Sequence, residues 1–217
     1  MRGENLVPIE FEIQVELPDK YSRRDEFPAQ DAGPVTAGFV GDALVLIPRP
    51  APPPPRPGMP APPPQAMEMQ LRARMTQAKQ DFARLMLGMF ANGTPAFPLT
   101  FAYVGQAEAP QGKADVLDVK GPANFIGRFF IAENGLPIMF SWQGASGGQS
   151  APGAPGAQGA PAPEQRLFFA DYKDVDGLKL PFRIRRAVGS ETTEETTFDR
   201  YRINAKVDPR RFDTTTK

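Results

Sequence analysis

Apolar and polar residues alternate along the first patterned stretch of the chain. The apolar positions are Val7, Ile9, Phe11, Ile13, Val15 and Leu17, and Glu10, Glu12, Gln14 and Glu16 lie between them. Because successive side chains of a strand point to opposite faces, this spacing predicts a long strand with one apolar and one solvated face. The chain therefore begins with a sheet that buries a single side.

Similar strand patterns recur later, separated by turn signals. Gly41-Asp42 divides VTAGFVGDALVLI into two short strands, and Glu133-Asn134-Gly135 joins two aromatic-rich strands. Further strand-like stretches are YSRRDEF, LTFAYVGQAE, KADVLDVKG, RLFFADYKDVDGLKLPFRIRRAV and ETTEETTFDRYRINAKV. Asp208 and Pro209 predict one short turn of helix near the end. Together these stretches predict roughly nine or ten antiparallel strands in sequential hairpins.

Residues 67–90 change from a strand period to a helix period. One helical face carries Leu71, Met75, Ala78, Phe82, Leu85, Met86 and Met89. Asn92-Gly93 supplies a helix stop. The expected fold class is therefore mainly β with one long helix (α+β). A meander of this length closes into a barrel or curls around the helix, so we expect a strongly curved antiparallel sheet, an incomplete β-barrel, covered by the helix.

The apolar helix face has two interpretations. It packs into an ordinary core, or it covers a hydrophobic cavity in which flexible methionines suit a ligand of variable shape. The second interpretation gives the candidate ligand-binding residues Leu71, Met75, Phe82, Leu85, Met86 and Met89. The sequence does not separate the two.

Two low-complexity segments interrupt the pattern. Residues 48–65 are rich in proline and residues 144–164 are rich in glycine, alanine and proline, so we expect flexible insertions within one domain that spans residues 1–217. Arg49, Pro52 and Pro55 have the spacing of an SH3-type ligand. A solvated spacer is the plainer interpretation of such a composition.

The stretch DYKDVDGLKLPFRI crowds three acidic residues around Gly177, as a calcium loop does. An EF-hand alignment on Gly177 places Arg183 where the bidentate carboxylate belongs, which excludes that site. Asp176-Gly177 between two apolar runs instead predicts a hairpin turn.

The composition of the chain limits the kinds of catalytic and metal-binding site that it can form. The chain has no histidine and no cysteine, which excludes thiolate sites and most nucleophile–base pairs, and we expect no enzyme, no cofactor and no metal. Glu194 and Glu195 are a conceivable acid/base pair, but neighbouring strand residues point to opposite faces. Equal numbers of basic and acidic residues give no field that attracts nucleic acid. No apolar run approaches the ~20 residues that span a bilayer.

The C-terminal third resembles a known family. LFFADYKDVDGLKLPFRIRR followed by ETTEETTFDRYRINAKVDPRRF is similar to the closing hairpins of LolA/LolB-like outer-membrane lipoprotein-sorting proteins. GKADVLDVKG, FFIAENGLPIMFSW and the first strand with PDKYSRRDEF follow the same order. The resemblance implies an incomplete curved barrel closed by helices around an apolar cavity, in which family carriers hold lipoprotein acyl chains in the periplasm.

Two departures accompany the resemblance. The family's N-terminal helix and export signal are absent from this sequence, so we expect further sequence upstream of Met1, and the two insertions are not part of the family pattern. The motifs are turns and strand ends, so no site residue is transferred from the family.

The sequence thus gives two hypotheses. The first is a non-enzymatic periplasmic or cell-envelope protein that binds or carries a lipid or lipoprotein acyl chain in a cavity between sheet and helix. The second is a structural or interaction module with a filled core, whose proline-rich loops contact an envelope protein partner.

Overall fold

The computed structural model describes residues 7–29, 33–48, 64–109, 112–144 and 162–212. These ranges contain eleven strands, one α-helix and one short 3-10 helix. Most of the two low-complexity segments, residues 49–63 and 145–161, lies outside the described residues, and so does the SH3-like spacing at Arg49, Pro52 and Pro55. The predictions for those segments stay predictions.

The chain divides into two compact units, and each contains one sheet. The first unit consists of Met1–Ala83, Thr94–Phe97 and Ala205–Lys217, and the second of Arg84–Gly93 and Pro98–Asn204. The helix α1 (Pro64–Phe90) contributes residues to both. The prediction of a single LolA-like domain stays a prediction.

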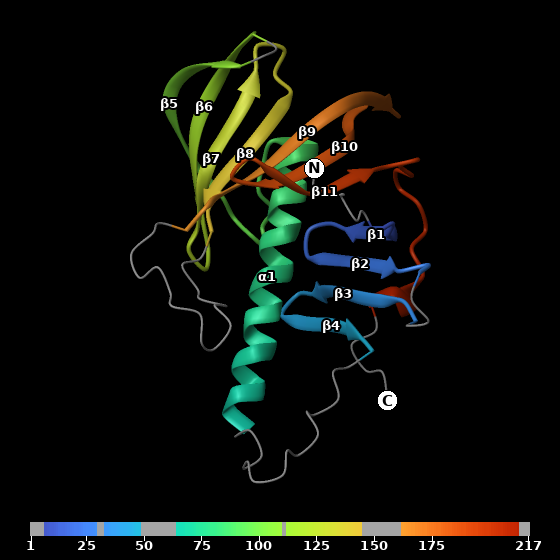
Figure 1. Ribbon diagram of the computed structural model, residues 1–217. Coiled ribbons are helices and arrows are strands. Elements are labelled where there is room, and N and C mark those ends of the chain that lie inside the picture. Colours follow the sequence, from blue (N-terminus) through green and yellow to red (C-terminus); the bar gives the residue numbers. More distant parts are fainter. Residues whose placement is uncertain (1–6, 30–32, 49–63, 110–111, 145–161, 213–217) are drawn as a thin grey trace. The chain divides into compact units, whose positions relative to one another are not determined.

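The first unit holds a four-stranded antiparallel sheet in the order β1-β2-β3-β4 (Figure 1). Its strands are β1 (Glu10–Glu16), β2 (Lys20–Glu26), β3 (Val35–Val40) and β4 (Ala43–Ile47). The turn expected at Gly41-Asp42 is confirmed, because β3 and β4 pair from Val40 and Ala43 onward and Gly41 has a φ of 56°. Consecutive hairpins therefore build this sheet, as the alternating pattern predicts.

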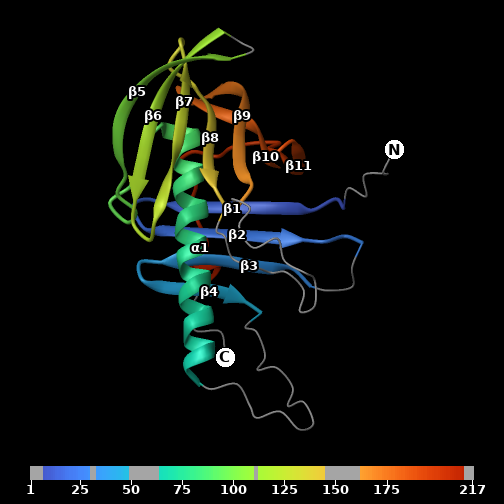
Figure 2. The same ribbon diagram turned by 60° about the vertical axis from the view of Figure 1, so that its left-hand side comes forward.

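The part of α1 that belongs to the first unit runs across one face of this sheet (Figure 2). Phe82 is fully buried there, with its ring centroid 5.6 Å from that of Tyr21 and 5.3 Å from that of Phe39. One turn earlier, Lys79 Nζ lies 2.7 Å from Asp42 Oδ1 and stands over the Phe39 ring. Three aromatic rings thus form the core between helix and sheet.

The second unit holds a seven-stranded antiparallel sheet in the order β11-β10-β9-β8-β7-β6-β5. The strands are β5 (Thr100–Ala109), β6 (Gly112–Gly121), β7 (Phe125–Ala132), β8 (Pro137–Gln143), β9 (Glu164–Val175), β10 (Leu178–Val188) and β11 (Glu191–Thr197). All neighbours in this sheet are consecutive in the chain, so it is a meander that leaves β5 and β11 as edges. The described strands are not closed into a barrel.

Two sheets therefore replace the one sheet that the sequence predicts. The hairpin sequence breaks between β4 and β5, because residues 49–63 and the 27 residues of α1 lie between these strands. In the described ranges, one long helix and a mainly β composition are confirmed.

The end of α1 packs in the second unit against the strand face that carries Phe169. A Cβ on Gly88 would lie 2.3 Å from the Phe169 ring, so only glycine allows the helix backbone to approach this closely. The Tyr172 hydroxyl donates a hydrogen bond of 2.7 Å to the Gly88 carbonyl oxygen. The guanidinium of the buried Arg84 stacks 4.3 Å above the Trp142 ring. Close backbone approach and stacking thus hold this end of the helix.

The helix ends at Phe90, as predicted, but Gly93 is not the left-handed residue that follows it. The left-handed residue that follows Phe90 is Ala91, with a φ of 52°, and its amide donates to the Leu87 carbonyl oxygen at 3.0 Å. Asn92 then uses its side-chain oxygen to accept a hydrogen bond from the Gly93 amide. The Asn-Gly pair therefore shapes the loop after the helix stop.

The acidic stretch near the end forms the hairpin turn that Asp176-Gly177 predicts. Leu178 pairs with Val175, and both turn residues have positive φ, 52° at Asp176 and 84° at Gly177. The Gly177 amide donates to Asp174 Oδ1 at 3.1 Å. The carboxylate of Asp174 thus supports the turn. The helical turn expected at Pro209 is also confirmed, as the 3-10 helix η1 (Pro209–Phe212).

Candidate functional site

The second unit contains a cavity of about 900 Å³, which we call the aromatic cavity. Its apolar lining includes Phe130, Leu136, Ile138, Met139, Phe168 and Phe169, and its charged lining includes Glu108, Lys113, Glu133, Asp171, Arg183, Arg185 and Glu195. Strands β5 to β11 and their connections supply all of these residues. A volume of this size is in the range of sites that take a small organic molecule, ~300–1,000 Å³.

A row of cross-strand neighbours forms one wall of the aromatic cavity. Phe130 on β7 pairs with Met139 on β8, Met139 pairs with Phe168 on β9, and Phe168 pairs with Arg185 on β10. Directly opposite residues in an antiparallel pair have Cβ atoms ~4.5–5.5 Å apart, so their side chains form a continuous strip. The strip is apolar across three strands and ends at a guanidinium.

This strip lies on the opposite face of the sheet from the fully buried row. Each strip residue has a buried neighbour in its own strand. These neighbours are Phe129, Phe140 and Leu167, which pair with one another across the strands and are at most 6% exposed. Because neighbouring residues in a strand alternate between faces, Phe130, Met139 and Phe168 point the other way. They are only half-buried. The strip therefore gives the face opposite this row an apolar surface of its own.

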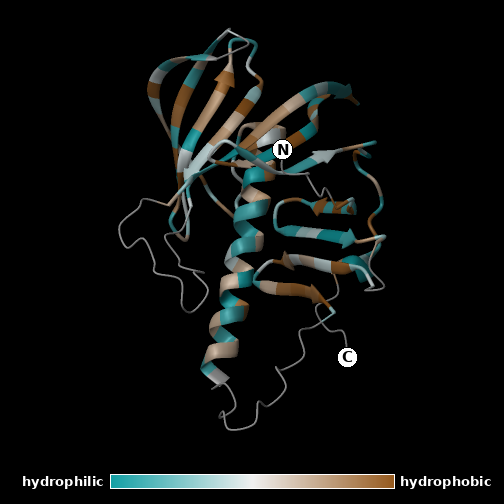
Figure 3. Cartoon of the chain, viewed as in Figure 1, coloured by the Kyte–Doolittle hydropathy of each residue, from teal (hydrophilic) through white to brown (hydrophobic). Residues whose placement is uncertain are grey.

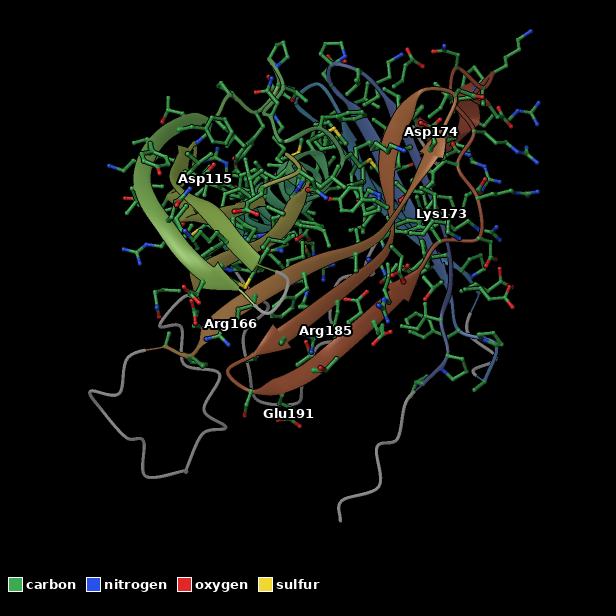
Figure 4. The ribbon with its side chains drawn as sticks, turned by 90° about the horizontal axis from the view of Figure 1, so that it is seen from above. Asp115, Arg166, Lys173, Asp174, Arg185 and Glu191 are labelled. Carbon is green, nitrogen blue, oxygen red and sulfur yellow. The ribbon has the colours of Figure 1, made fainter. Side chains whose placement is uncertain are left out.

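Arg185 covers the end of the apolar strip. Its guanidinium carbon stands 4.3 Å from the centroid of the Phe168 ring, and Nη1 donates to the Thr192 hydroxyl at 3.1 Å. Figure 4 labels Arg185 on β10, between β9 and β11. Within the part of the chain that the structure describes, Arg185 forms no ion pair with a carboxylate. A cation held by a ring and a hydroxyl keeps its remaining N–H donors for a bound group.

The other guanidinium of the cavity is already neutralised. Arg183 Nε lies 3.0 Å from Asp171 Oδ2, and Nη1 lies 3.8 Å from Glu195 Oε1. Both acids also line the cavity. The rim therefore carries charges of both signs beside an apolar wall, which suits a ligand with a long apolar part and a polar end.

Tyr172 also lines the cavity, but its hydroxyl is used structurally. It donates to the Gly88 carbonyl oxygen. Burial, followed by repulsion from the charge that Tyr201 would carry, raises the pKa of Tyr172 above its ordinary value. A phenol whose pKa is raised does not act as a base near neutral pH. Tyr172 therefore fixes the wall and the helix end together.

Acid–base and metal chemistry find little support among the described residues. They contain no cluster of three or more carboxylate, histidine or cysteine side chains that could hold a metal ion. Glu194 and Glu195 point to opposite faces, where Glu194 lies 3.8 Å from Arg186 and Glu195 lies 3.8 Å from Arg183.

The structure does not bring the six predicted ligand-binding residues to this cavity. Leu71, Met75 and Phe82 belong to the first unit, and Leu85, Met86 and Met89 belong to the second. Phe82, Leu85 and Met86 are buried, Met75 and Met89 are half-buried, and Leu71 is exposed. None of the six lines the aromatic cavity. Ligand contact by this helix face stays a prediction.

Sequence reasoning missed the strip of Phe130, Met139, Phe168 and Arg185. Each strand shows its own alternation, but the strip exists only when the strands are in register. Phe129-Phe130 and Phe168-Phe169 were the available signals, because two adjacent aromatic residues in a strand place one ring on each face. Such a doublet indicates a sheet with apolar surface on both sides.

Comparisons with protein-family models, with curated proteins and with solved structures give no match. No helix in the described ranges combines the length and the apolar character that crossing a membrane requires. The site is therefore interpreted from its own geometry.

Proposed function

We propose that this chain is a non-enzymatic binding or carrier protein for a lipid or a lipoprotein acyl chain, acting in the periplasm or cell envelope. The aromatic cavity takes the acyl chain, and a strongly curved seven-stranded sheet shapes it. The observation that carries the proposal is the half-buried strip of Phe130, Met139 and Phe168 on the wall of a cavity of about 900 Å³.

Physical chemistry supports an acyl chain over a compact polar ligand. Burial of each methylene contributes about 0.8 kcal/mol, so a chain laid along three large apolar side chains binds mainly by removal of apolar surface from water. Met139 adapts its shape to such a ligand, because its thioether side chain is flexible. Arg185 at the end of the strip offers hydrogen-bond donors to a polar end group.

The proposal is tested by titrating the full chain with a fluorescent fatty acid such as cis-parinaric acid. Phe168→Ser and Met139→Ser each remove apolar wall, and we expect each to weaken binding about tenfold or more. Ile126→Ser is the matched control, because Ile126 is 59% exposed in the same sheet and does not line the cavity. We expect this control to bind like the unmodified chain.

The same titration distinguishes the cavity from the helix face. Met75 belongs to the first unit and does not line the aromatic cavity, so Met75→Ser changes only the helix face. If Met75→Ser weakens binding and Phe168→Ser does not, the ligand contacts the helix face instead of the strip. Failure of the unmodified chain to bind the probe, or to retain any extractable lipid after purification, would contradict the carrier proposal itself.

A further inference from the structure

A second cavity, of about 260 Å³, lies in the first unit and differs in character from the aromatic cavity. We call it the arginine cavity, and the side chains that matter to the argument are Glu12, Gln14, Ser22, Arg24, Arg210 and Arg211. We propose that it binds a small oxyanion, a carboxylate or phosphate group, on a molecule that also carries a hydroxyl group. This inference is independent of the lipid proposal.

Strand register builds the floor of the arginine cavity from polar residues. Glu12 on β1 pairs with Arg24 on β2, and Arg24 pairs with Thr36 on β3. Two residues further along the same face, Gln14 pairs with Ser22. Figure 3 shows β2 as a mostly hydrophilic strand. These side chains alternate with Tyr21 and therefore lie on the other face of the sheet from the Tyr21–Phe39–Phe82 core.

The helix η1 brings two further guanidiniums to this floor. Arg210 and Arg211 both line the cavity, and Phe212, which follows them, is buried. Three arginines therefore surround the cavity, against one lining carboxylate, Glu12. A 3-10 helix anchored by its last residue holds the two arginines over the strands.

The described carboxylates near the arginine cavity neutralise only two of its three guanidinium groups. Arg211 Nη2 lies 3.2 Å from Glu12 Oε2, and Arg24 Nη2 lies 3.3 Å from Glu26 Oε2. Arg210 pairs with no carboxylate in the described residues, since only its backbone amide contacts Asp208. One guanidinium is thus left over, and guanidinium groups bind carboxylates and phosphates through paired N–H donors.

Gln14 adds a separate sign of a bound molecule. Its Oε1 atom is buried and accepts no hydrogen bond, although a buried acceptor without a partner costs free energy. The amide cannot be turned around to relieve this, because Nε2 donates to Glu12 Oε1 at 3.2 Å and a carboxylate accepts only. A hydroxyl of a ligand would supply the missing donor.

The volume limits the size of the ligand. Liquid water occupies ~30 Å³ per molecule, so a cavity of about 260 Å³ has room for a compact polar molecule. Arginine donors and a hydrogen-bond acceptor in one cavity fit a hydroxy acid or a phosphorylated alcohol. The chemistry common to both is an oxyanion beside a hydroxyl.

The test titrates the full chain by calorimetry at low ionic strength with citrate, with tricarballylate, which is citrate without its hydroxyl, and with inorganic phosphate. We expect citrate to bind about threefold to tenfold more tightly than tricarballylate, because only citrate donates to Gln14 Oε1. Gln14→Met should remove this difference. Arg210→Ala should weaken citrate and phosphate binding about tenfold.

Arg72→Ala is the matched control. It removes the same charge from the same unit, from a side chain that is 77% exposed on α1. We expect it to leave binding unchanged, with folding of every variant checked by circular dichroism. The proposal is overturned if the unmodified chain binds none of the three probes, if Arg72→Ala weakens binding as much as Arg210→Ala, or if citrate and tricarballylate bind equally.

Discussion

Gly88 illustrates how a single residue decides a packing interaction. In an exposed helix position, alanine is more favourable than glycine by about 1 kcal/mol. At position 88 the added methyl group would meet the ring of Phe169, which is 4% exposed and has little space to move. The packing cost therefore outweighs the helix propensity.

We expect Gly88→Ala to lower the free energy of unfolding by about 1–3 kcal/mol, as overpacking of a core does. Urea denaturation measures this change. Gly33→Ala is the control, since nothing lies within 4 Å of a Cβ built on Gly33. Adding Phe169→Leu to Gly88→Ala should restore part of the loss. A Gly88→Ala variant more stable than the unmodified chain would contradict the contact.

Tyr172 makes stability depend on pH at the alkaline end. Its pKa is raised in the folded state, so above about pH 10 the unfolded chain loses the phenolic proton while the folded chain keeps it. The unfolded state then binds fewer protons, and the free energy of unfolding falls as pH rises. Below that pH the contribution is fully present.

We expect Tyr172→Phe to be less stable at neutral pH by about 1 kcal/mol, because the hydrogen bond to the Gly88 carbonyl is lost. We also expect its stability to fall less steeply than that of the unmodified chain between about pH 10 and 12. Denaturation at several pH values gives both quantities. An unchanged slope would show that Tyr172 ionises equally in both states.

At the scale of elements, the β9–β10 hairpin depends on its turn residues. Gly177 has a φ of 84° and Asp176 a φ of 52°. Aspartate tolerates this left-handed region better than most residues, and glycine adopts it without cost. We expect Gly177→Ala to lower the free energy of unfolding by about 1 kcal/mol and Asp176→Asn to be nearly neutral. Thermal unfolding of the pair checks the prediction. Equal destabilisation by both would contradict it.

The local elements could be predicted because each depends on a short stretch of sequence. The alternation of Val7 to Leu17 predicts β1, and the turn signals at Gly41 and Gly177 predict two hairpins. The end of α1 at Phe90 was also predicted, but the left-handed residue that follows it is Ala91 and not Gly93. The Ala91 amide donates a hydrogen bond to the Leu87 carbonyl oxygen, which stabilises this conformation. Alanine has no preference for left-handed backbone, so the sequence does not predict it.

The candidate sites could not be predicted in the same way. The strip in the aromatic cavity joins strands that are up to 55 residues apart, between Phe130 and Arg185, and depends on the exact pairing of β7 to β10. The arginine cavity combines Gln14 with Arg210 from the opposite end of the chain. Both arise from long-range register, which alternation within one strand does not specify.

At the scale of the whole molecule, the division into two units predicts separable stability. Phe39 is fully buried against Tyr21 and Phe82 in the first unit. We expect Phe39→Ala to cost about 3–5 kcal/mol there and to speed amide hydrogen exchange in β1–β4, with little change in β5–β11. Phe140→Ala should show the reverse, since Phe140 is buried in the second unit. Equal acceleration throughout the chain would contradict this division.

The stacking of Arg84 on Trp142 has an optical consequence. Trp142 is the only tryptophan of the chain, and it belongs to the second unit, where Phe140 also stacks on it. Its emission spectrum therefore responds to events around the seven-stranded sheet. Tyr21 is the sole tyrosine of the first unit. The other three tyrosines, Tyr103, Tyr172 and Tyr201, belong to the second unit, so a tyrosine signal that reports on the four-stranded sheet alone requires their replacement by phenylalanine.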